Sequence, residues 1–427
     1  MKSTDNFLRD HKLRAKDIDL DSLVSMFTEE MNRGLQGKKS SLHMIPTYFE
    51  VNNQFLTDVP VVAIDAGGTN FRTALIKFTK EGKLESGEIF NYRMPGLESE
   101  VSATVFFETI AGYIKPIADK SDCIGFCFSY PTEITPERDG KLLQFCKEVQ
   151  APEVVGKLIG KTLLETMGLS NKKIVLLNDT VATLLAGKSS AFGKSYDSFI
   201  GFILGTGSNT SYMEMNENIV KNYTLESGKS QIINIESGNF ARAPRTDLDL
   251  EFDLSTIDPG MYSFEKMFSG AYFGGFCLTV LKAAAREDVF TSETAIKLNA
   301  LETLTAVEVS NFSENVRITG NMLAENIAND DDLEKCQVLI NCLIDRASKL
   351  VAGNLAAVVL KTGKGKSVGK PILITVEGTT YYKMHNLRNG IEGYLTRYLS
   401  GERNRYIEFT QVSHSSLIGA ALGALTD

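Results

Sequence analysis

Residues 61–78, VVAIDAGGTNFRTALIKF, combine a strand-forming apolar run with side chains that can do chemistry. Asp65 ends the run, and Gly67, Gly68 and Thr69 follow it. Without a Cβ, glycine lets its backbone approach an anionic ligand, and successive N–H groups form an anion cradle. The carboxylate of Asp65 would suit Mg²⁺, held directly or through water. The same letters also fit a tight hairpin in which both glycines adopt positive φ, and this stretch alone does not decide between the two interpretations.

A second turn of the same kind lies within residues 199–215, FIGFILGTGSNTSYMEM. Gly205, Thr206 and Gly207 stand between two strand-like runs, about 140 residues after the first turn. Two such hairpins facing each other across a cleft can grip the γ-phosphate of a nucleotide. The pair therefore favours phosphate binding over a purely structural hairpin.

A candidate strand between the two turns ends in polar residues. KKIVLLND, residues 172–179, reads as a short buried strand ending at Asn178 and Asp179, and TVATLLAG begins a helix. Polar side chains at the carboxyl end of a strand are well placed for a ligand cleft. From spacing alone, however, Asp179 could serve as the N-cap of a helix beginning at Thr180 or Val181.

The wider apolar pattern predicts an α/β protein. Helical spacing is found over residues 18–36, 154–167 and 333–360, and Gly168 is expected to stop the second of these helices. The small-residue segment SSLIGAALGAL predicts a last helix. Two strand–turn–strand units of similar design indicate two lobes, with a boundary near residues 178–200.

Composition argues against several other classes of protein. A net charge of −8 does not suit a nucleic-acid-binding face, and no apolar run of about 18 residues predicts a membrane span. The N-terminus lacks the apolar core of a signal peptide. The six cysteines form no CxxC pair or zinc spacing, and they indicate buried thiols in a reducing cytoplasm. Each GKS or GKT tripeptide lacks the earlier glycine of a P-loop.

Together the motifs resemble those of the hexokinases, within the actin-like sugar-kinase superfamily. DAGGTNFR resembles the first phosphate motif, and LGTGSNTSYME resembles the second. LNDTVATLLAG is similar to the catalytic segment, and FSYPTE and LLQFCK to the two sugar-loop elements. INIESGNF and DPGMYSFEKMFSG resemble the glutamate motifs, and VEGTTYYKMH the adenosine segment. The order and spacing hold over roughly residues 20–425, which is far more specific than any single motif.

The resemblance implies a two-lobed actin-like ATPase (ribonuclease-H-like) α/β fold with a central ligand cleft. We expect a small lobe at residues 40–178, to which residues 412–427 return, and a large lobe at 179–411. Residues 1–39 are expected to form a helical segment. The implied reaction is transfer of the ATP γ-phosphoryl group, with Mg²⁺, to the 6-hydroxyl of a hexose, with glucose as the expected substrate. The expected protein is a cytoplasmic monomer or homodimer.

The same resemblance assigns roles residue by residue. Asp179 matches the catalytic base, and Lys147 is expected to supply positive charge. The sugar-binding positions correspond to Ser129, Tyr130, Cys146, Lys147, Asn178, Asp179, Asn209, Glu236 and Glu265. The phosphate, metal and nucleoside positions correspond to Asp65 (also the metal ligand), Gly67, Gly68, Thr69, Asn70, Arg72, Gly205, Thr206, Gly207, Gly378, Thr379 and Ser416.

Five departures from the family pattern affect the expected site. Cys146 replaces a sugar-binding threonine, and a thiol is a weaker hydrogen-bonding group than a hydroxyl. Ser237 replaces a tryptophan, Tyr130 a phenylalanine, and Glu377 an aspartate. HSSLIG, near the C-terminus, replaces a DGSGKG-like element beside the adenosine.

Simpler interpretations remain at this stage. Glu236 and Glu265 could be surface carboxylates, Lys147 could pair with Glu148 on the surface, and Ser129 could be only a turn residue. An ATPase of the actin or chaperone type would share the turns but would not need the sugar-binding glutamates. A catalytically weak sugar sensor would not need Asp179. A repressor-linked sugar kinase would carry a cysteine-rich zinc element, which the sequence lacks.

Overall fold

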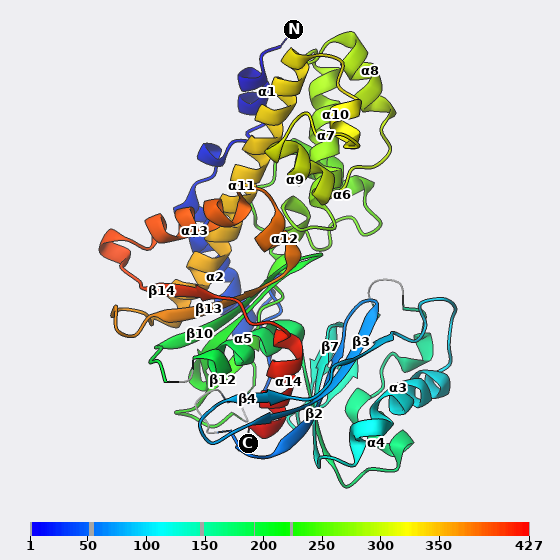
Figure 1. Cartoon of the computed structure of the whole chain (residues 1–427). Helices are drawn as coiled ribbons and strands as arrows, with labels where there is room; N and C mark the ends of the chain where they lie inside the picture. The colour runs from blue at the N-terminus through cyan, green and yellow to red at the C-terminus, as the bar shows by residue number, and fades with distance from the viewer. Residues whose placement is uncertain (1, 51–54, 146–148, 192, 223–224, 427) are drawn as a thin grey trace.

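The computed structural model describes residues 2–50, 55–145, 149–191, 193–222 and 225–426, which form two lobes built on separate six-stranded sheets (Figure 1). We call them the small lobe and the large lobe. The small-lobe sheet has the order β4-β3-β2-β6-β9, with β5 also paired to β3. Its strands are β2 (Pro60–Ala66), β3 (Asn70–Phe78), β4 (Leu84–Ser86), β5 (Phe90–Arg93), β6 (Cys123–Phe128) and β9 (Lys173–Leu177).

The small-lobe sheet combines a hairpin with parallel strands. β2 and β3 are antiparallel, whereas β2, β6 and β9 run parallel. α3 (Ala103–Ala118) and α4 (Ile159–Met167) pack against each other in this lobe, and β7 (Thr132–Ile134) and β8 (Gly140–Leu142) form a separate hairpin. Most apolar residues of the parallel strands β2, β6 and β9 are buried, as their continuous apolar sequences predict, whereas β4 is exposed.

The large-lobe sheet has the order β1-β12-β11-β10-β13-β14, and helices extend beyond it (Figure 1). Its strands are β1 (Ile45–Pro46), β10 (Ser198–Leu204), β11 (Ser208–Met215), β12 (Ser230–Asn234), β13 (Ile372–Glu377) and β14 (Ile407–Thr410). The helices of this lobe are α1 (Thr4–Asp10), α2 (Leu20–Leu35), α6 (Asp247–Ser255), α7 (Phe273–Arg286), α8 (Ser292–Ala300), α9 (Ala306–Glu314), α10 (Met322–Glu325), α11 (Asp330–Thr362), α12 (Thr379–Lys383) and α13 (Leu387–Tyr398).

Two helices join the lobes. α5 (Asp179–Ser190) follows the small-lobe strand β9 directly but packs on the large-lobe strands β10 and β13. α14 (Ser415–Leu425) comes last in the chain and packs against α5, β6 and β2 (Figure 1). The predicted small-residue helix is therefore confirmed, and its small side chains allow this close approach between sheet and helix.

The predicted helix over residues 154–167 is wrong over its first five residues, 154–158. A 3-10 turn covers Pro152–Val154, and α4 begins only at Ile159. Gly156 lies between them at φ +83°, a backbone conformation that interrupts a right-handed helix. The predicted end is confirmed, because Gly168 caps α4 in the left-handed conformation.

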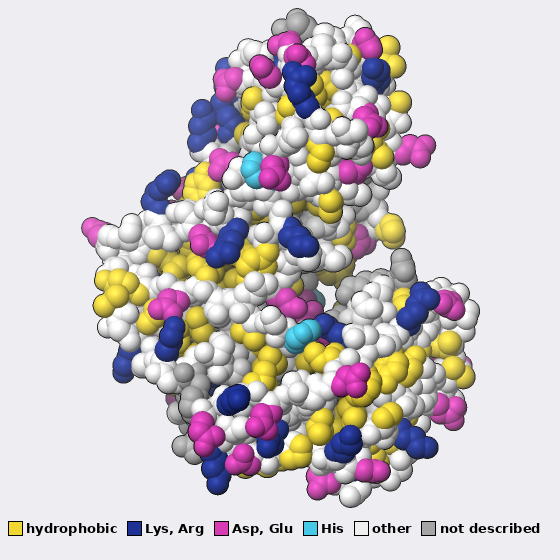
Figure 2. Space-filling model, in the orientation of Figure 1, with side chains coloured by type: hydrophobic (Ala, Val, Ile, Leu, Met, Phe, Trp, Pro, Cys, Tyr) yellow, Lys and Arg dark blue, Asp and Glu magenta, His cyan; other side chains and the backbone are white. Residues whose placement is uncertain are grey.

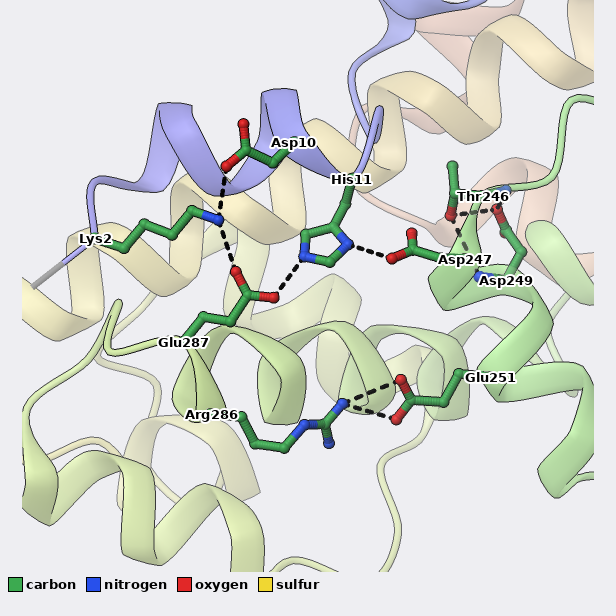
Figure 3. Close-up of polar contacts among 9 residues, drawn as sticks. All are labelled: Lys2, Asp10, His11, Thr246, Asp247, Asp249, Glu251, Arg286 and Glu287. Carbon is green, nitrogen blue, oxygen red and sulfur yellow. Dashed lines mark hydrogen bonds and ion pairs between the residues drawn. The ribbon is translucent and has the colours of Figure 1, made fainter.

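The N-terminal segment is held to the large lobe by a group of charged side chains (Figure 3). His11 lies 2.7 Å from Asp247 through Nδ1 and 2.7 Å from Glu287 through Nε2. Lys2 donates to Glu287 at 2.7 Å and pairs with Asp10 at 2.8 Å. Although burial opposes the effect, the bonds from Lys2 and His11 hold the pKa of Glu287 below its ordinary value.

Two further predictions concern the cysteines and the membrane. Cys123, Cys127, Cys277, Cys336 and Cys342 are free thiols, and three of them are fully buried. Within the described part of the chain, no helix has the length and apolar character needed to span a bilayer.

Candidate active site

The carboxyl ends of parallel strands bring the predicted small-lobe residues to one edge. Ala66 pairs with Phe128, and Cys127 pairs with Leu177. The next residues along the three strands therefore leave the sheet side by side, and they include Ser129 and Asn178. This is the arrangement expected of a ligand site in an α/β sheet.

The large-lobe sheet presents a matching edge. β10 and β13 are parallel, and Ile203 pairs with Glu377. The turn at Gly205 and the turn at Gly378 consequently lie next to each other. A Cβ placed on Gly205 would be 3.5 Å from the Cα of Gly378.

A cavity of about 250 Å³ lies between the two lobes. Tyr130, Asn178 and Glu236, all predicted sugar-binding residues, contribute to its wall. The other lining residues are His43, Ile45, Thr47, Phe128, Pro131, Thr132, Ile134, Leu143, Gln144, Leu176, Leu177, Asn234, Asn239, Met261 and Tyr262. Figure 2 shows the surface hollowed where the lobes meet. A site walled by both lobes can change shape when the lobes move.

The first glycine turn forms an open polar pocket. Its lining residues are Asp65, Gly67, Gly68, Thr69, Asn70, Arg72 and Asn91. Gly67 N–H donates to the Asn70 carbonyl at 3.0 Å, which closes the turn. Neither glycine of this turn is among the described glycines with positive φ, so a positive-φ hairpin does not explain them. A Cβ on Gly67 would meet only the Asn70 carbonyl, at 3.8 Å, so the glycine leaves space in front of the backbone.

Asp65 and Arg72 face each other across this hairpin and form an ion pair. Arg72 Nε donates to Asp65 Oδ2 at 2.9 Å, and its Nη2 bonds the same oxygen. Burial raises the pKa of Asp65, and the arginine only partly opposes this effect. A phosphate in the pocket would be close to this partly exposed guanidinium.

The second glycine turn is enclosed. The Gly205 carbonyl accepts from Gly270 N–H and from Thr380 Oγ1, both at 2.8 Å. The Thr206 carbonyl accepts from Ala271 N–H at 3.0 Å, while the side chain of Thr206 stays exposed. A Cβ on Gly207 would be 2.9 Å from Glu265 Oε2. Hydrogen bonds and close packing thus fix this turn from several sides.

Asn178, and not Asp179, is the N-cap of α5. The Asn178 side chain accepts from Thr180 N–H at 2.9 Å, and the helix begins at Asp179 itself. The proposal that Asp179 caps a helix beginning at Thr180 or Val181 is therefore wrong. Asp179 occupies the first turn, where the helix dipole favours a negative charge. Burial is the main cause of the raised pKa of Asp65, Glu236 and Glu377, and the negative charge of Asp179 adds to the increase in each.

Glu236 is held in a polar cluster at the cavity wall. Asn234 Nδ2 donates to its Oε1 at 2.8 Å, and Asn209 Nδ2 contacts the same oxygen at 3.3 Å. Glu236 adopts φ +58°, a strained conformation for a residue with a side chain. Burial raises the pKa of its carboxyl above the ordinary value. Glu236 is thus not a freely exposed surface carboxylate.

Glu265 stabilises the second turn through a hydrogen bond to its backbone. Its Oε2 accepts from Ser208 N–H at 2.8 Å, and burial raises its pKa to about 7. The next residue, Lys266, is buried and bonds Asp253 at 2.7 Å and Thr256 at 2.8 Å. These contacts hold the loop that carries Met261 and Tyr262 at the cavity.

The sequence prediction did not assign a role to Glu377. This residue ends β13, contacts Thr183 Oγ1 at 3.4 Å, and has a pKa raised to about 7 by burial and then by Asp179 and Asp65. The sequence signal that identifies Asp65 is also present at Glu377, because each acid lies within the last two residues of a buried strand and precedes a glycine by one or two residues. Asn234, at the end of β12, lines the cavity and also has no predicted role.

The remaining predicted residues differ in their placement. Cys146 and Lys147 lie outside the described residues, as does Glu148. Ser129 is partly buried, and its N–H donates to the Ala66 carbonyl at 3.1 Å. Thr379 is exposed beside the second turn, whereas Ser416 is buried in the first turn of α14. A buried serine offers a nucleoside little accessible surface.

Two sequence models described as hexokinase match the chain, over residues 4–189 and 199–426. Hexokinase-7 of Oryza sativa subsp. japonica is 30% identical over 431 residues, covering 94% of this chain and 92% of that protein. Glucokinase-1 of Kluyveromyces lactis is 28% identical over 468 residues, covering 95% and 94%. The structure is similar to that of a hexokinase from Schistosoma mansoni complexed with glucose, with a TM-score of 0.79, 20% identity, and coverage of 99% and 100%. The predicted two-lobed fold is confirmed.

Proposed function

The chain belongs to the hexokinase family of ATP-dependent sugar kinases, and from that premise we propose that it transfers the γ-phosphoryl group of ATP to the 6-hydroxyl of a hexose. The observation that carries the proposal is the position of Asp179. This carboxylate begins α5 directly after Asn178 of the sugar cavity, and its charge acts on the strand-end acids Asp65 and Glu377.

Asp179 is proposed to orient the 6-hydroxyl and to accept its proton late in the reaction. A free alcohol is far less acidic than a carboxylic acid, so a carboxylate does not fully remove the proton of the hydroxyl in advance. The alcohol becomes acidic as its bond to phosphorus forms, and the proton then moves to Asp179. Such a base typically contributes a factor of about 10² to 10⁴ in rate.

The two turns are proposed to hold the phosphates in line with the hydroxyl. Phosphoryl transfer needs little covalent chemistry from the protein and depends on alignment and on stabilisation of charge. The backbone N–H groups of Gly68, Thr69, Thr206 and Gly207 are the proposed donors, since those of Gly67 and Gly205 already bond within their turns, and Arg72 adds a cation. Closure of the lobes would exclude water, which could otherwise attack ATP.

The acidic residues fit Mg²⁺ delivered with ATP. Among the described residues, no group of three or more candidate ligands gathers as a dedicated metal site. Mg²⁺ in kinases is usually held by one or two carboxylates together with substrate phosphates. Asp65 and Glu377 are the strand-end oxygen donors for that role, and the ion would neutralise charge on the phosphates.

The sugar is proposed to be recognised by the mixed amides and acids of the large lobe. Hexose hydroxyls both donate and accept hydrogen bonds, so carboxylates and amides can read their positions. Glu236, Asn209 and Glu265 are already linked through hydrogen bonds to one another or to the second turn. Glucose is the first substrate to test.

The test is a coupled ADP-release assay with MgATP and glucose, mannose, fructose or no sugar. Asp179→Asn should lower kcat by about 10² to 10⁴ while glucose affinity changes less than about threefold. Asp122→Asn makes the same charge change at an exposed small-lobe position and should match the wild type. ADP release without sugar would support the ATPase alternative, and glucose binding without turnover would support the sensor.

A further inference from the structure

Tyr130 connects three parts of the small lobe. Its side chain is only 2% exposed and lines the sugar cavity. The ring packs against Phe128, with centroids 4.9 Å apart, and edge-on against Phe145 at 5.0 Å. These contacts fix the direction of the ring without using its hydroxyl.

The hydroxyl of Tyr130 reaches the first glycine turn. It donates to the Gly67 carbonyl at 2.7 Å and lies 3.4 Å from the Gly68 carbonyl. The sugar loop and the phosphate turn leave neighbouring strands here, and Ser129 N–H already bonds the Ala66 carbonyl. A single side chain at the sugar cavity therefore holds the backbone of the phosphate pocket.

Peptide geometry gives this bond a consequence. In a trans peptide, the carbonyl of one residue and the N–H of the next point in opposite directions. The described chain has no cis peptide bond, so fixing the Gly67 carbonyl toward Tyr130 directs the Gly68 N–H the opposite way. That N–H belongs to the backbone lining the polar pocket with Asp65 and Arg72.

The turn itself offers little resistance to rotation of this peptide. Glycine has a broad range of backbone conformations, and a Cβ on Gly67 would meet only one atom, at 3.8 Å. Gly67 N–H is held by the Asn70 carbonyl, but that bond constrains the preceding peptide. Among the described residues, the Tyr130 hydroxyl is the side-chain group that donates a hydrogen bond to the Gly67 carbonyl, and so it fixes the Gly67–Gly68 peptide.

We propose that Tyr130 is a positioning residue whose hydroxyl orients the Gly68 N–H to receive an ATP phosphate, and so links the sugar loop to the phosphate turn. This role rests on the proposed hexose kinase activity. It also explains why a tyrosine stands where the hexokinase pattern has phenylalanine, because phenylalanine has no hydroxyl to bond the Gly67 carbonyl.

The experiment compares the wild type with Tyr130→Phe, which keeps the packed ring and removes only the hydroxyl. We expect KM for MgATP to rise about threefold to tenfold, the loss typical of one hydrogen bond. The Kd for glucose should change less than about twofold, since the ring still lines the cavity. Tyr196→Phe is the matched control, because its hydroxyl bonds Glu408 on the exposed surface.

Calorimetric titration with the magnesium complex of a non-hydrolysable ATP analogue measures the phosphate site directly, and melting temperatures monitor folding. Weaker analogue binding in Tyr130→Phe with unchanged glucose binding supports the proposal. Unchanged KM and analogue affinity would overturn it, and so would an equal loss of glucose and analogue binding with a lower melting temperature. If the wild type shows no hexose-dependent ADP release, the proposed function fails, and the analogue titration still decides the role of Tyr130.

Discussion

The glycine turn at residues 67–69 is open on one side, whereas the turn at residues 205–207 is enclosed by other segments of the large lobe. A Cβ on Gly67 would meet one atom at 3.8 Å, but a Cβ on Gly207 would be 2.9 Å from Glu265. The carbonyl of Gly205 accepts two hydrogen bonds from outside its own hairpin. The first turn also accepts hydrogen bonds from outside its hairpin, from Tyr130 Oη to the Gly67 carbonyl and from Met94 N–H to the Thr69 carbonyl, but the space beside Gly67 stays open.

Similar sequence patterns therefore have different physical reasons for their glycines. In the first turn, glycine leaves space for a ligand to approach the backbone. In the second, glycine is needed because neighbouring protein atoms already occupy the space. The second turn is consequently suited to act as a fixed support, and the first as the part whose conformation can be adjusted.

The largest expected effect is a loss of stability when Gly378, which packs against the start of the enclosed turn, is replaced. Gly378 has φ +117°, and a Cβ there would lie 2.2 Å from the Leu204 carbonyl oxygen. Gly378→Ala should lower the free energy of unfolding by roughly 4 kcal/mol or more, because both strain and a backbone clash result. Gly393→Ala, at a helical site where the new Cβ would meet no other described segment within 4 Å, should be neutral or slightly stabilising in the same urea titration. A stable Gly378→Ala protein would contradict the fixed-support interpretation.

In the open turn at residues 67–69, a glycine substitution should affect MgATP binding and leave stability almost unchanged. Gly67→Ala is expected to change the free energy of unfolding by less than about 1 kcal/mol, since the space is free and φ is not positive. KM for MgATP should rise about tenfold, because the methyl group would hinder close approach of a phosphate. Urea unfolding and steady-state kinetics separate the two effects. A large loss of stability would show that this glycine too is required by packing.

The pH dependence of glucose binding tests the role of Glu265, which stabilises the enclosed turn. Its pKa of about 7 in the folded chain exceeds the ordinary 4.5, mainly through burial. Hexose hydroxyls donate best to an ionised carboxylate, so glucose affinity should rise by up to about tenfold per unit as pH increases toward 7, and then level off. Calorimetric binding measurements check this dependence, and Glu265→Gln should flatten it.

The raised pKa of Glu265 also determines how the stability of the folded chain changes with pH. Because the folded state holds its proton more tightly, the stabilising contribution of Glu265 is complete below about pH 4.5 and is lost as pH rises through 7. The wild type should therefore lose more stability over this range than Glu265→Gln does. Equal losses in the two proteins would assign the pH dependence to another group.

The smallest expected effect lies away from both turns, in the N-terminal cluster (Figure 3). His11→Ala removes the hydrogen bonds to Asp247 and Glu287 and should cost about 1 kcal/mol of stability, as is typical of side-chain hydrogen bonds. Turnover should remain unchanged, because neither turn is touched. A selective loss of kcat with normal melting would instead connect this segment to catalysis.

Much of the fold could be predicted from local patterns. The strands at residues 172–179 and 199–215 and the helices at 18–36 and 333–360 follow from apolar periodicity and are confirmed. The false start at residues 154–158 shows the limit of that signal, because Gly156 interrupts the helix while the apolar spacing continues. The candidate site residues came from order and spacing of motifs, and their roles stay predictions.

What the sequence by itself determined is the set of chemical groups and the strand ends that carry them, since apolar runs define strands and the polar residues after them lie at sheet edges. Only the tertiary structure decided how each group is held. It made Asn178 the helix cap, brought Glu377 into contact with Thr183 of α5, and joined Tyr130 to Gly67. These contacts link residues on different strands and loops, and their distances depend on the packing of whole elements. Local spacing along the chain does not contain that information.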